Sequence, residues 1–214
     1  SPTPTPTAAP SSTPTAGPPS PPASPFVPTP TPSPYAPTPT PWHLVIDYDD
    51  YSGNGSSSIA LWRPADGSWL IQDLTRIYYG TAGDIPAAGD YNGDGTADIC
   101  LFRPSQGKWF LRDPVTGLSL WNSAYGANGD IPAPADYNGD FRTDTALYRP
   151  SVGKWFIRGL TTFYHGLDTD TPIPGDYNGD GTADTALFRP FPGGAAWYVR
   201  NLTVLYYGQS YDRP

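Results

Sequence analysis

A nine-residue acidic motif is the feature of this sequence whose residue types and spacing could do chemistry. It is DYNGDGTAD over residues 90–98 and again over 176–184, and DYNGDFRTD over residues 136–144. Positions 1, 3, 5 and 9 of each copy carry oxygen-bearing side chains. A tight turn can point alternate side chains at one centre, and Ca²⁺ takes six to eight oxygen ligands in this manner. The motif therefore predicts one calcium site in each copy.

The expected ligands are four side chains and the backbone carbonyl of position 7. They are Asp90, Asn92, Asp94, Thr96 and Asp98; Asp136, Asn138, Asp140, Arg142 and Asp144; and Asp176, Asn178, Asp180, Thr182 and Asp184. Glycine at position 6 permits the sharp turn, and Phe141 departs from that pattern. The loop lacks a glutamate at position 12 and precedes a strand, so it is not an EF-hand. Magnesium suits the loop less well because it prefers to keep its waters.

The alternative to a metal site is a plain Asn-Gly or Asp-Gly turn. Three copies with acids at positions 1, 5 and 9 favour the metal, because unmetallated carboxylates at this spacing repel one another. A fourth copy, DYSGNGSSS over residues 50–58, has lost two carboxylates, and we expect no ion there. Three calcium ions would change the formal net charge of the chain from -8 to -2.

The acidic motifs belong to an internal repeat over residues 42–214. Four units begin near residues 50, 90, 136 and 176, and each contains an Arg-Pro pair, at Arg63, Arg103, Arg149 and Arg189. Repeats of this length are typical of propeller blades or stacked solenoids. The chain has no Glu or Met, and it is rich in Gly, Asp and aromatic residues, which favours strands and tight turns over helices. We expect an all-β fold, a β-propeller of about four four-stranded blades.

The four expected strands of a unit are Gly-Asp-Tyr, Ala-Leu-Phe-Arg, a tryptophan strand and an aromatic strand ending near Tyr-Gly. Asp84-Ile85-Pro86 and its equivalents are expected to be turns between units. Residues 44–47 would supply the first strand of the first unit, and residues 212–214 align with residues 84–86. The units could close as a ring, which hides sheet edges. Alternatively they could stack openly and continue into a neighbour.

Three sets of side chains invite a functional interpretation and also have a structural one. The tryptophans could stack on sugars, but their strand positions favour core packing. The arginines could bind an anion, but bidentate pairing with aspartate is the simpler expectation. The single cysteine, Cys100, excludes an intrachain disulfide and is expected to be a small buried strand residue. The tryptophans are Trp69, Trp109, Trp155 and Trp197.

Several function classes are disfavoured by the sequence. The acidic balance gives no basic stripe to meet nucleic-acid phosphates, and no apolar run is long enough to span a bilayer. The two histidines, His43 and His165, lie in different units and share no motif. Nucleophile elbows, zinc signatures and phosphate loops are missing from the sequence. We therefore expect no catalytic residues and no enzyme activity.

Residues 1–41 differ in composition from the repeat region. They contain 17 Pro and 15 Ser or Thr and no charged residue. Proline at this density prevents helix and sheet, so an extended polyproline-type tail is expected. Fully extended, it would span about 125 Å, roughly three times the width of the repeat domain. The composition suits an O-glycosylated stalk or a plain flexible linker.

The acidic loop followed by a strand ending in Arg-Pro resembles the FG-GAP/VCBS-type repeats of integrin α-subunit propellers and many bacterial surface proteins. The resemblance covers residues 42–214. It implies a β-propeller with calcium at the blade loops and an extracellular role in adhesion, carbohydrate binding or scaffolding. We expect a secreted or cell-surface structural protein that self-assembles through its glycosylated tail. The alternative is a lectin-like or adhesion module on a glycosylated stalk.

Overall fold

The computed structural model describes residues 50–72, 74 and 76–214. All of them belong to the second of the two units into which the chain divides, residues 44–214. The tail predicted over residues 1–41 and the strand predicted over residues 44–47 lie outside the described residues. Within the described part, regular structure consists of fifteen strands and two three-residue 3-10 helices, η1 (Pro104–Gln106) and η2 (Pro150–Val152). No helix in this part is long and apolar enough to cross a membrane.

The strands form four antiparallel sheets in chain order. The first sheet contains β1 (Ala60–Arg63), β2 (Ser68–Ile71) and β3 (Ile77–Tyr78). The second contains β4 (Ile85–Pro86), β5 (Ile99–Arg103), β6 (Lys108–Arg112) and β7 (Ser119–Ala124). The third contains β8 (Ile131–Pro132), β9 (Ala146–Arg149), β10 (Lys154–Ile157) and β11 (Thr161–Tyr164). The fourth contains β12 (Thr171–Pro172), β13 (Ala186–Phe191), β14 (Gly194–Val199) and β15 (Thr203–Tyr206).

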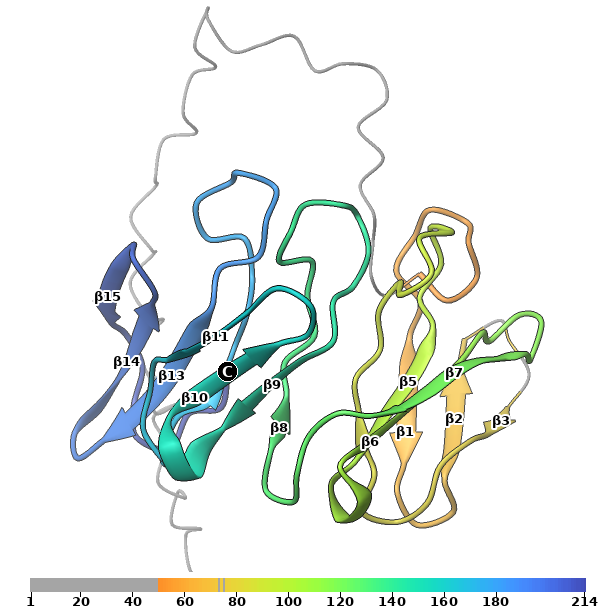
Figure 1. The fold of residues 1–214 in the computed structure, drawn as a ribbon, viewed down its shortest axis with the longest axis horizontal. Helices are drawn as coiled ribbons and strands as arrows, with labels where there is room; N and C mark the ends of the chain where they lie inside the picture. The colour runs from red at the N-terminus through yellow and green to blue at the C-terminus, as the bar shows by residue number, and fades with distance from the viewer. Residues whose placement is uncertain (1–49, 73, 75) are drawn as a thin grey trace, which may run out of the picture. The chain divides into compact units, whose positions relative to one another are not determined.

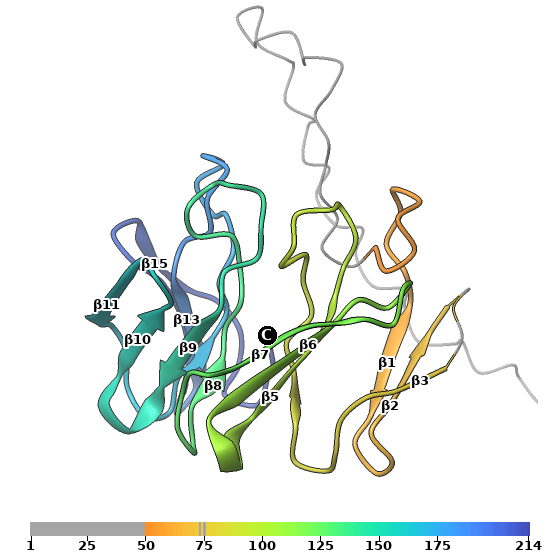
Figure 2. The same ribbon diagram turned by 45° about the vertical axis from the view of Figure 1, so that its right-hand side comes forward.

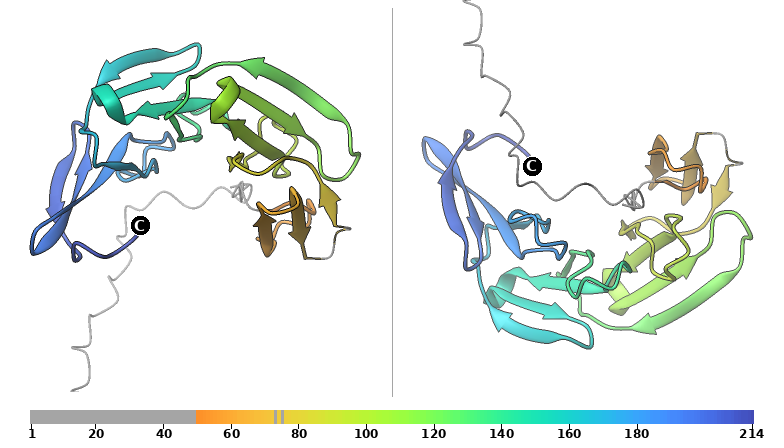
Figure 3. Two further views of the ribbon diagram at one scale, coloured as in Figure 1. Left: turned by 90° about the horizontal axis from the view of Figure 1, so that it is seen from below. Right: turned by 90° about the horizontal axis from the view of Figure 1, so that it is seen from above.

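The sheets follow one another around a common axis as the blades of a four-bladed β-propeller (Figures 1 and 2). This confirms the predicted fold class. Viewed along the axis, the first and fourth sheets are the two ends of an arc (Figure 3). Each sheet is a meander of neighbouring strands, which the dense Gly, Pro and Asp turns of the repeat make possible.

The first strand of each complete sheet is not where the sequence pattern predicted it. The predicted strand at Gly-Asp-Tyr is reduced to an isolated bridge, such as Gly89 with Asp98. The predicted turn at Ile85–Pro86 is instead the strand β4, paired with Phe102 and Leu101 of β5. Proline is compatible with this place because it lies at the end of a short strand, where its missing N–H breaks no ladder.

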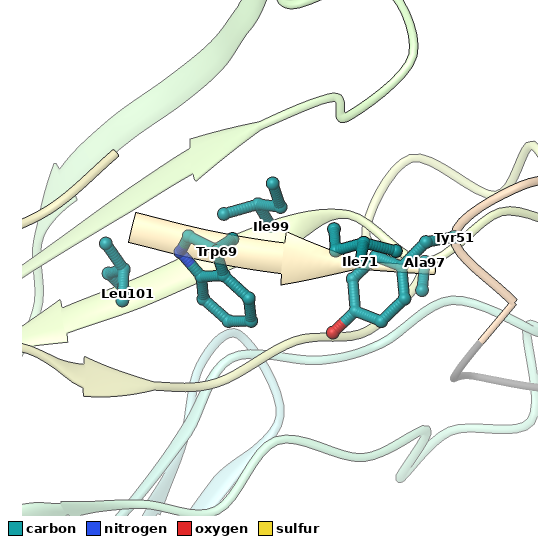
Figure 4. Packing of buried hydrophobic residues seen from close by; sticks show 6 residues of the cluster. All are labelled: Tyr51, Trp69, Ile71, Ala97, Ile99 and Leu101. Atoms are coloured by element: carbon teal, nitrogen blue, oxygen red, sulfur yellow. The ribbon is translucent and has the colours of Figure 1, made fainter. Parts of the chain in front are cut away.

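The core consists of aromatic and aliphatic side chains between consecutive sheets. Figure 4 shows the cluster between the first two sheets, where Trp69 and Ile71 of β2 pack with Ile99 and Leu101 of β5. Strand β5 is buried on both faces, because one face packs against the first sheet and the other packs with Leu147 of the third sheet. Buried and partly exposed residues alternate along β6, and Trp109 and Leu111 are the buried ones.

The structural interpretation of the tryptophans and of the cysteine is confirmed. Trp69, Trp109 and Trp155 are buried, and each indole N–H donates to a carbonyl in the last strand or the following turn of its own sheet. Trp197 is partly exposed. Cys100 is a free, buried residue of β5. Burial raises the pKa of its thiol far above the ordinary value, so Cys100 stays a neutral packing group.

Candidate metal centre

The four acidic loops lie at the same end of the four sheets (Figure 1). In the three complete sheets, each loop joins the two-residue first strand to the long second strand. An antiparallel bridge closes the base of each loop, for example between Gly89 and Asp98. Positions 1 and 9 are therefore held side by side, while positions 3, 5 and 7 are on the turn.

The position-1 aspartate folds the loop around its own carboxylate. Asp90 accepts hydrogen bonds from the N–H groups of Gly93 at 2.6 Å and Gly95 at 2.8 Å. The same two positions donate to Asp50, Asp136 and Asp176. The two N–H groups can reach one carboxylate because positions 4 and 6 adopt positive φ, as at Gly93 (78°) and Gly95 (85°).

Positions 3, 5 and 7 form a polar rim. Asn92 Oδ1 accepts from the N–H of Asp94 at 2.8 Å, and Asp94 Oδ1 accepts from the N–H of Thr96 at 2.8 Å. Partial burial opposes ionisation of Asp94, yet the hydrogen bonds from Thr96 and Asn92 hold its pKa below the ordinary value. No residue of the described chain donates a hydrogen bond to the Thr96 carbonyl oxygen, the ligand predicted at position 7.

The position-9 aspartate lies beneath this rim and is the most buried carboxylate of the loop. Asp98 has 0% exposure, and among the described residues its carboxylate accepts only from the N–H of Tyr91 at 3.0 Å and from the Asn92 amide at 3.5 Å. Burial, followed by the charges of Asp94 and Asp90, raises its pKa to about 7. A buried carboxylate with weak partners and negative neighbours would gain from a cation.

The other two predicted loops repeat this arrangement. In the loop over residues 136–144, burial and neighbouring charges raise the pKa of Asp144, whose carboxylate accepts from the N–H of Tyr137. Phe141 takes φ 65° at position 6, where the other loops have glycine, so this loop has a backbone penalty. In the loop over residues 176–184, Asp184 accepts from the N–H of Tyr177, and Asp176 is exposed.

The tyrosine at position 2 of each loop is a contributor that the motif-based interpretation missed. Tyr91 donates its backbone N–H to Asp98 and its hydroxyl to the carbonyl of Ala87 at 2.5 Å. Tyr137 and Tyr177 repeat both bonds. The signal was present in the sequence, because tyrosine follows the first aspartate in all four units.

The degenerate loop over residues 50–58 is a natural control. Asp50 accepts from Gly53 and Gly55 at 2.8 and 2.6 Å, and those glycines have the same positive φ as their counterparts. This loop therefore folds with Asn54 at position 5 and Ser58 at position 9. The carboxylates at these positions in the other three loops are not needed to form the turn.

Consecutive loops are bonded to one another. The carbonyl of the position-1 aspartate accepts from the position-8 N–H of the next loop: Ala97 to Asp50 at 2.7 Å, Thr143 to Asp90 at 2.6 Å, and Ala183 to Asp136 at 2.7 Å. The side chain of Arg142 also lies directly beside Gly93 of the preceding loop. Changes in one loop are therefore transmitted to the end of the adjacent sheet.

The carboxylates of each loop are directed at backbone N–H groups rather than at a common point. Within residues 50–72, 74 and 76–214, no group of three Asp, His or Cys side chains is arranged to hold a metal ion. All five predicted ligand positions in each loop are nevertheless oxygen donors within nine residues of chain. The hydrogen bonds to the position-1 aspartate form the backbone turn on which these positions lie.

Three of the repeated arginines form ion pairs with aspartates that precede their sheets, as the structural interpretation predicted. The pairs are Arg103 with Asp84, Arg149 with Asp130, and Arg189 with Asp170. Arg63 is exposed and forms no ion pair within the described residues. His165 is partly buried, with Nε2 3.3 Å from the Tyr198 carbonyl oxygen.

Neither the protein-family models nor the curated proteins with which the sequence was compared match this chain.

Proposed function

We propose that this protein is an extracellular structural protein whose propeller is stabilised by calcium and which self-assembles through its Pro/Thr-rich tail. Its role is mechanical rather than catalytic. The observation that carries the proposal is the contrast between the loop over residues 50–58 and its three acidic counterparts. The turn forms without acids at positions 5 and 9, yet three loops retain both.

The retained acids carry an electrostatic penalty that a cation would remove. The raised pKa of Asp98 reflects burial beside Asp94 and Asp90. Bound Ca²⁺ supplies positive charge and hard-cation coordination to oxygen ligands. Side chains at positions 1, 3, 5 and 9 and the carbonyl of position 7 would hold it. At a calcium concentration ten times Kd, each site would contribute about 1.4 kcal/mol to stability.

Metal content measured on the purified full chain tests the calcium part. We expect three Ca²⁺ per chain and a lower melting temperature after chelation. Asp184→Asn should reduce the content by one ion, whereas Asp66→Asn, an exposed aspartate outside the loops, should leave it unchanged. Metal-free protein whose melting is indifferent to a chelator would refute the proposal.

The tail carries the assembly part of the proposal. Residues 1–41 offer many hydroxyls for O-glycosylation, and a polyproline-type conformation would make them longer than one domain, so a neighbouring copy or a glycan coat would be needed to hold them. Deletion of residues 1–41 should abolish fibres seen by electron microscopy. Normal polymerisation of the shortened chain would show that the tail is not the assembly element.

A second candidate function is carbohydrate binding by a module on a glycosylated stalk. The observation that favours it is the exposure of three tyrosines at and after the end of the last strand of the fourth sheet: Tyr206, Tyr207 and Tyr211. Aromatic faces exposed in this way suit the apolar faces of sugars. A glycan array probed with the wild type and with Tyr207→Ala distinguishes this candidate, which requires binding that the substitution removes.

A further inference from the structure

Each interface between consecutive sheets in this chain is built from the same contacts. A leucine of one sheet buries itself against the tryptophan of the preceding sheet. The pairs belong to three core clusters: Leu101 with Trp69, Leu147 with Trp109, and Leu187 with Trp155. All three leucines have at most 1% exposure.

A glycine of the preceding sheet makes room for each of these leucines. A Cβ built on Gly80 would lie 2.6 Å from Leu101 Cδ1, and one on Gly126 would lie 2.8 Å from Leu147 Cδ1. The third interface repeats this at 2.6 Å between Gly166 and Leu187. The interface is therefore a leucine projecting into a socket formed by tryptophan and glycine.

The two ends of the array carry the two unused halves of this interface. Leu61 of β1 is 62% exposed and Ile59 beside it is 68% exposed, although their counterparts in the second sheet, Leu101 and Ile99, are buried. At the other end, Trp197 is partly exposed, and the three atoms nearest to a Cβ built on Gly208 belong to Asp212, Ala195 and Phe188 rather than to a leucine. Within the described residues, the first sheet thus presents the projecting leucine, and the fourth sheet presents the tryptophan and the glycine of the socket.

The repeated ion pair is also divided between the two ends. Asp212 forms the same turn as Asp84: its carboxylate accepts from the N–H of Gln209 at 2.7 Å, as that of Asp84 accepts from Thr81 at 2.8 Å. The partner of Asp84 is an arginine 19 residues later. Within the described residues, Asp212 forms no ion pair with an arginine, and Arg63 forms no ion pair with a carboxylate.

The chain segment after Asp212 matches the missing strand of the first sheet. In the complete sheets, a two-residue strand ending in proline pairs with the second strand, as Ile85 and Pro86 pair with Phe102 and Leu101. Strand β1 has no such partner within the described residues. The same register would pair Arg213 with Trp62 and Pro214 with Leu61. Residues 44–46 lie outside the described residues; they occupy the same repeat positions as residues 84–86, but Leu44 stands at the position of Asp84.

The acidic loops show the same division. The carbonyls of Asp50, Asp90 and Asp136 each accept from the next loop, whereas no backbone N–H of the described chain donates to the carbonyl of Asp176. Tyr177 is 44% exposed, while Tyr51 in the first loop is 4% exposed. The carbonyl at position 1 of the fourth loop therefore has no backbone donor within the described residues, unlike its counterparts in the first three loops.

We propose that the fourth sheet of one copy docks on the first sheet of a second copy and reproduces the interface that joins consecutive sheets within the chain. Leu61 enters the socket of Trp197 and Gly208, Arg63 pairs with Asp212, and Arg213–Pro214 completes the first sheet. Such a head-to-tail contact is heterologous, so it produces a ring if the rotation closes and a filament if it does not. This surface is independent of the tail.

Zero-length cross-linking of the full chain tests the contact. In Arg63→Lys, a carbodiimide should join the introduced amine to Asp212. An equal mixture of ¹⁴N- and ¹⁵N-labelled chains, analysed by mass spectrometry, should yield this link between light and heavy peptides. Adding Leu61→Asp should abolish the link, whereas adding Val152→Asp, an exposed apolar residue of η2, should leave it unchanged.

The same experiment separates the possible failures. Absence of the link, or its persistence in the Leu61→Asp chain, overturns the proposal. Links found only within one isotope mean that the chain closes on itself, which also overturns it. Tail side chains cannot form carbodiimide links that would be confused with this one, because residues 1–41 contain neither an amine side chain nor a carboxylate side chain. Loss of fibres on tail deletion with the link retained would show that the two associations are separate.

Discussion

Arg103 and Asp84 form a bidentate ion pair in which Nε donates to Oδ1 and Nη2 donates to Oδ2, both at 2.7 Å. The carboxylate has no exposed surface, and the guanidinium also lies over the ring of Phe110. Asp84 additionally accepts from the N–H of Thr81, so one side chain joins the turn between two sheets to the second strand of the next. The same ion pair recurs in the third and fourth sheets, where it holds the turn before the first strand against the second strand.

Removing one member of such a pair should be costly, because the other charge stays in a partly buried place. We expect Asp130→Ala to lower the free energy of unfolding by about 1–3 kcal/mol. Urea denaturation measures this. Asp66→Ala, which removes an exposed pair with Arg76, is the control and should cost less than about 1 kcal/mol. Equal effects of the two substitutions would contradict the structural role of the buried pair.

The leucine of each interface should contribute strongly only where a socket receives it. Leu147→Ala removes a buried side chain that packs with Trp109, so we expect a loss of about 2–5 kcal/mol. Leu61→Ala, measured at a concentration low enough to keep chains separate, should cost less than about 0.5 kcal/mol. A large effect of Leu61→Ala on isolated chains would indicate that the ends of the array meet within one chain.

Phe141 occupies a left-handed position without a structural reason visible in its surroundings. Its ring is 60% exposed, so little packing is lost on its removal. We expect Phe141→Gly to raise the free energy of unfolding by about 1 kcal/mol, because glycine adopts positive φ without a Cβ clash. Phe141→Ala is the matched control and should show no such gain, since alanine keeps the Cβ. Thermal denaturation of the calcium-free protein measures both.

The position-9 carboxylates should make the calcium-free protein sensitive to pH. Asp98 has a pKa of about 7 in the fold, above its ordinary value of 3.8. The unfolded chain therefore releases this proton first, so the contribution of Asp98 is present below about pH 4 and is lost as the pH rises to about 7. We expect chelated protein to lose stability over this range.

Two comparisons check that pH effect. Asp98→Asn should flatten the slope, because an amide does not titrate. Saturating calcium should also flatten it, because the ion favours the ionised carboxylate. Chemical denaturation at a series of pH values gives the slopes, and an unchanged slope in Asp98→Asn would assign the pH dependence to other groups.

Much of this protein was determined locally and could be predicted from its sequence. The acidic motif, the Arg-Pro pair and the tryptophan recur in each unit, so the sequence pattern alone predicts four equivalent sheets and four loops. Turn-forming residues and strand-forming aromatics influence the backbone conformation of only the few residues around them. The all-β class and the burial of Trp109 and Cys100 could therefore be predicted from the local sequence pattern.

Only the tertiary structure decided how these parts meet. It placed the first strand at Ile85–Pro86, because pairing with β5 depends on a neighbour and not on local propensity. It selected the aspartate 19 residues earlier as the partner of Arg103, Arg149 and Arg189. It also left Leu61 exposed while burying Leu101 in the same repeat position. The same residue type at the same repeat position has opposite burial, because its burial depends on whether another sheet precedes it, and this information is absent from any single repeat.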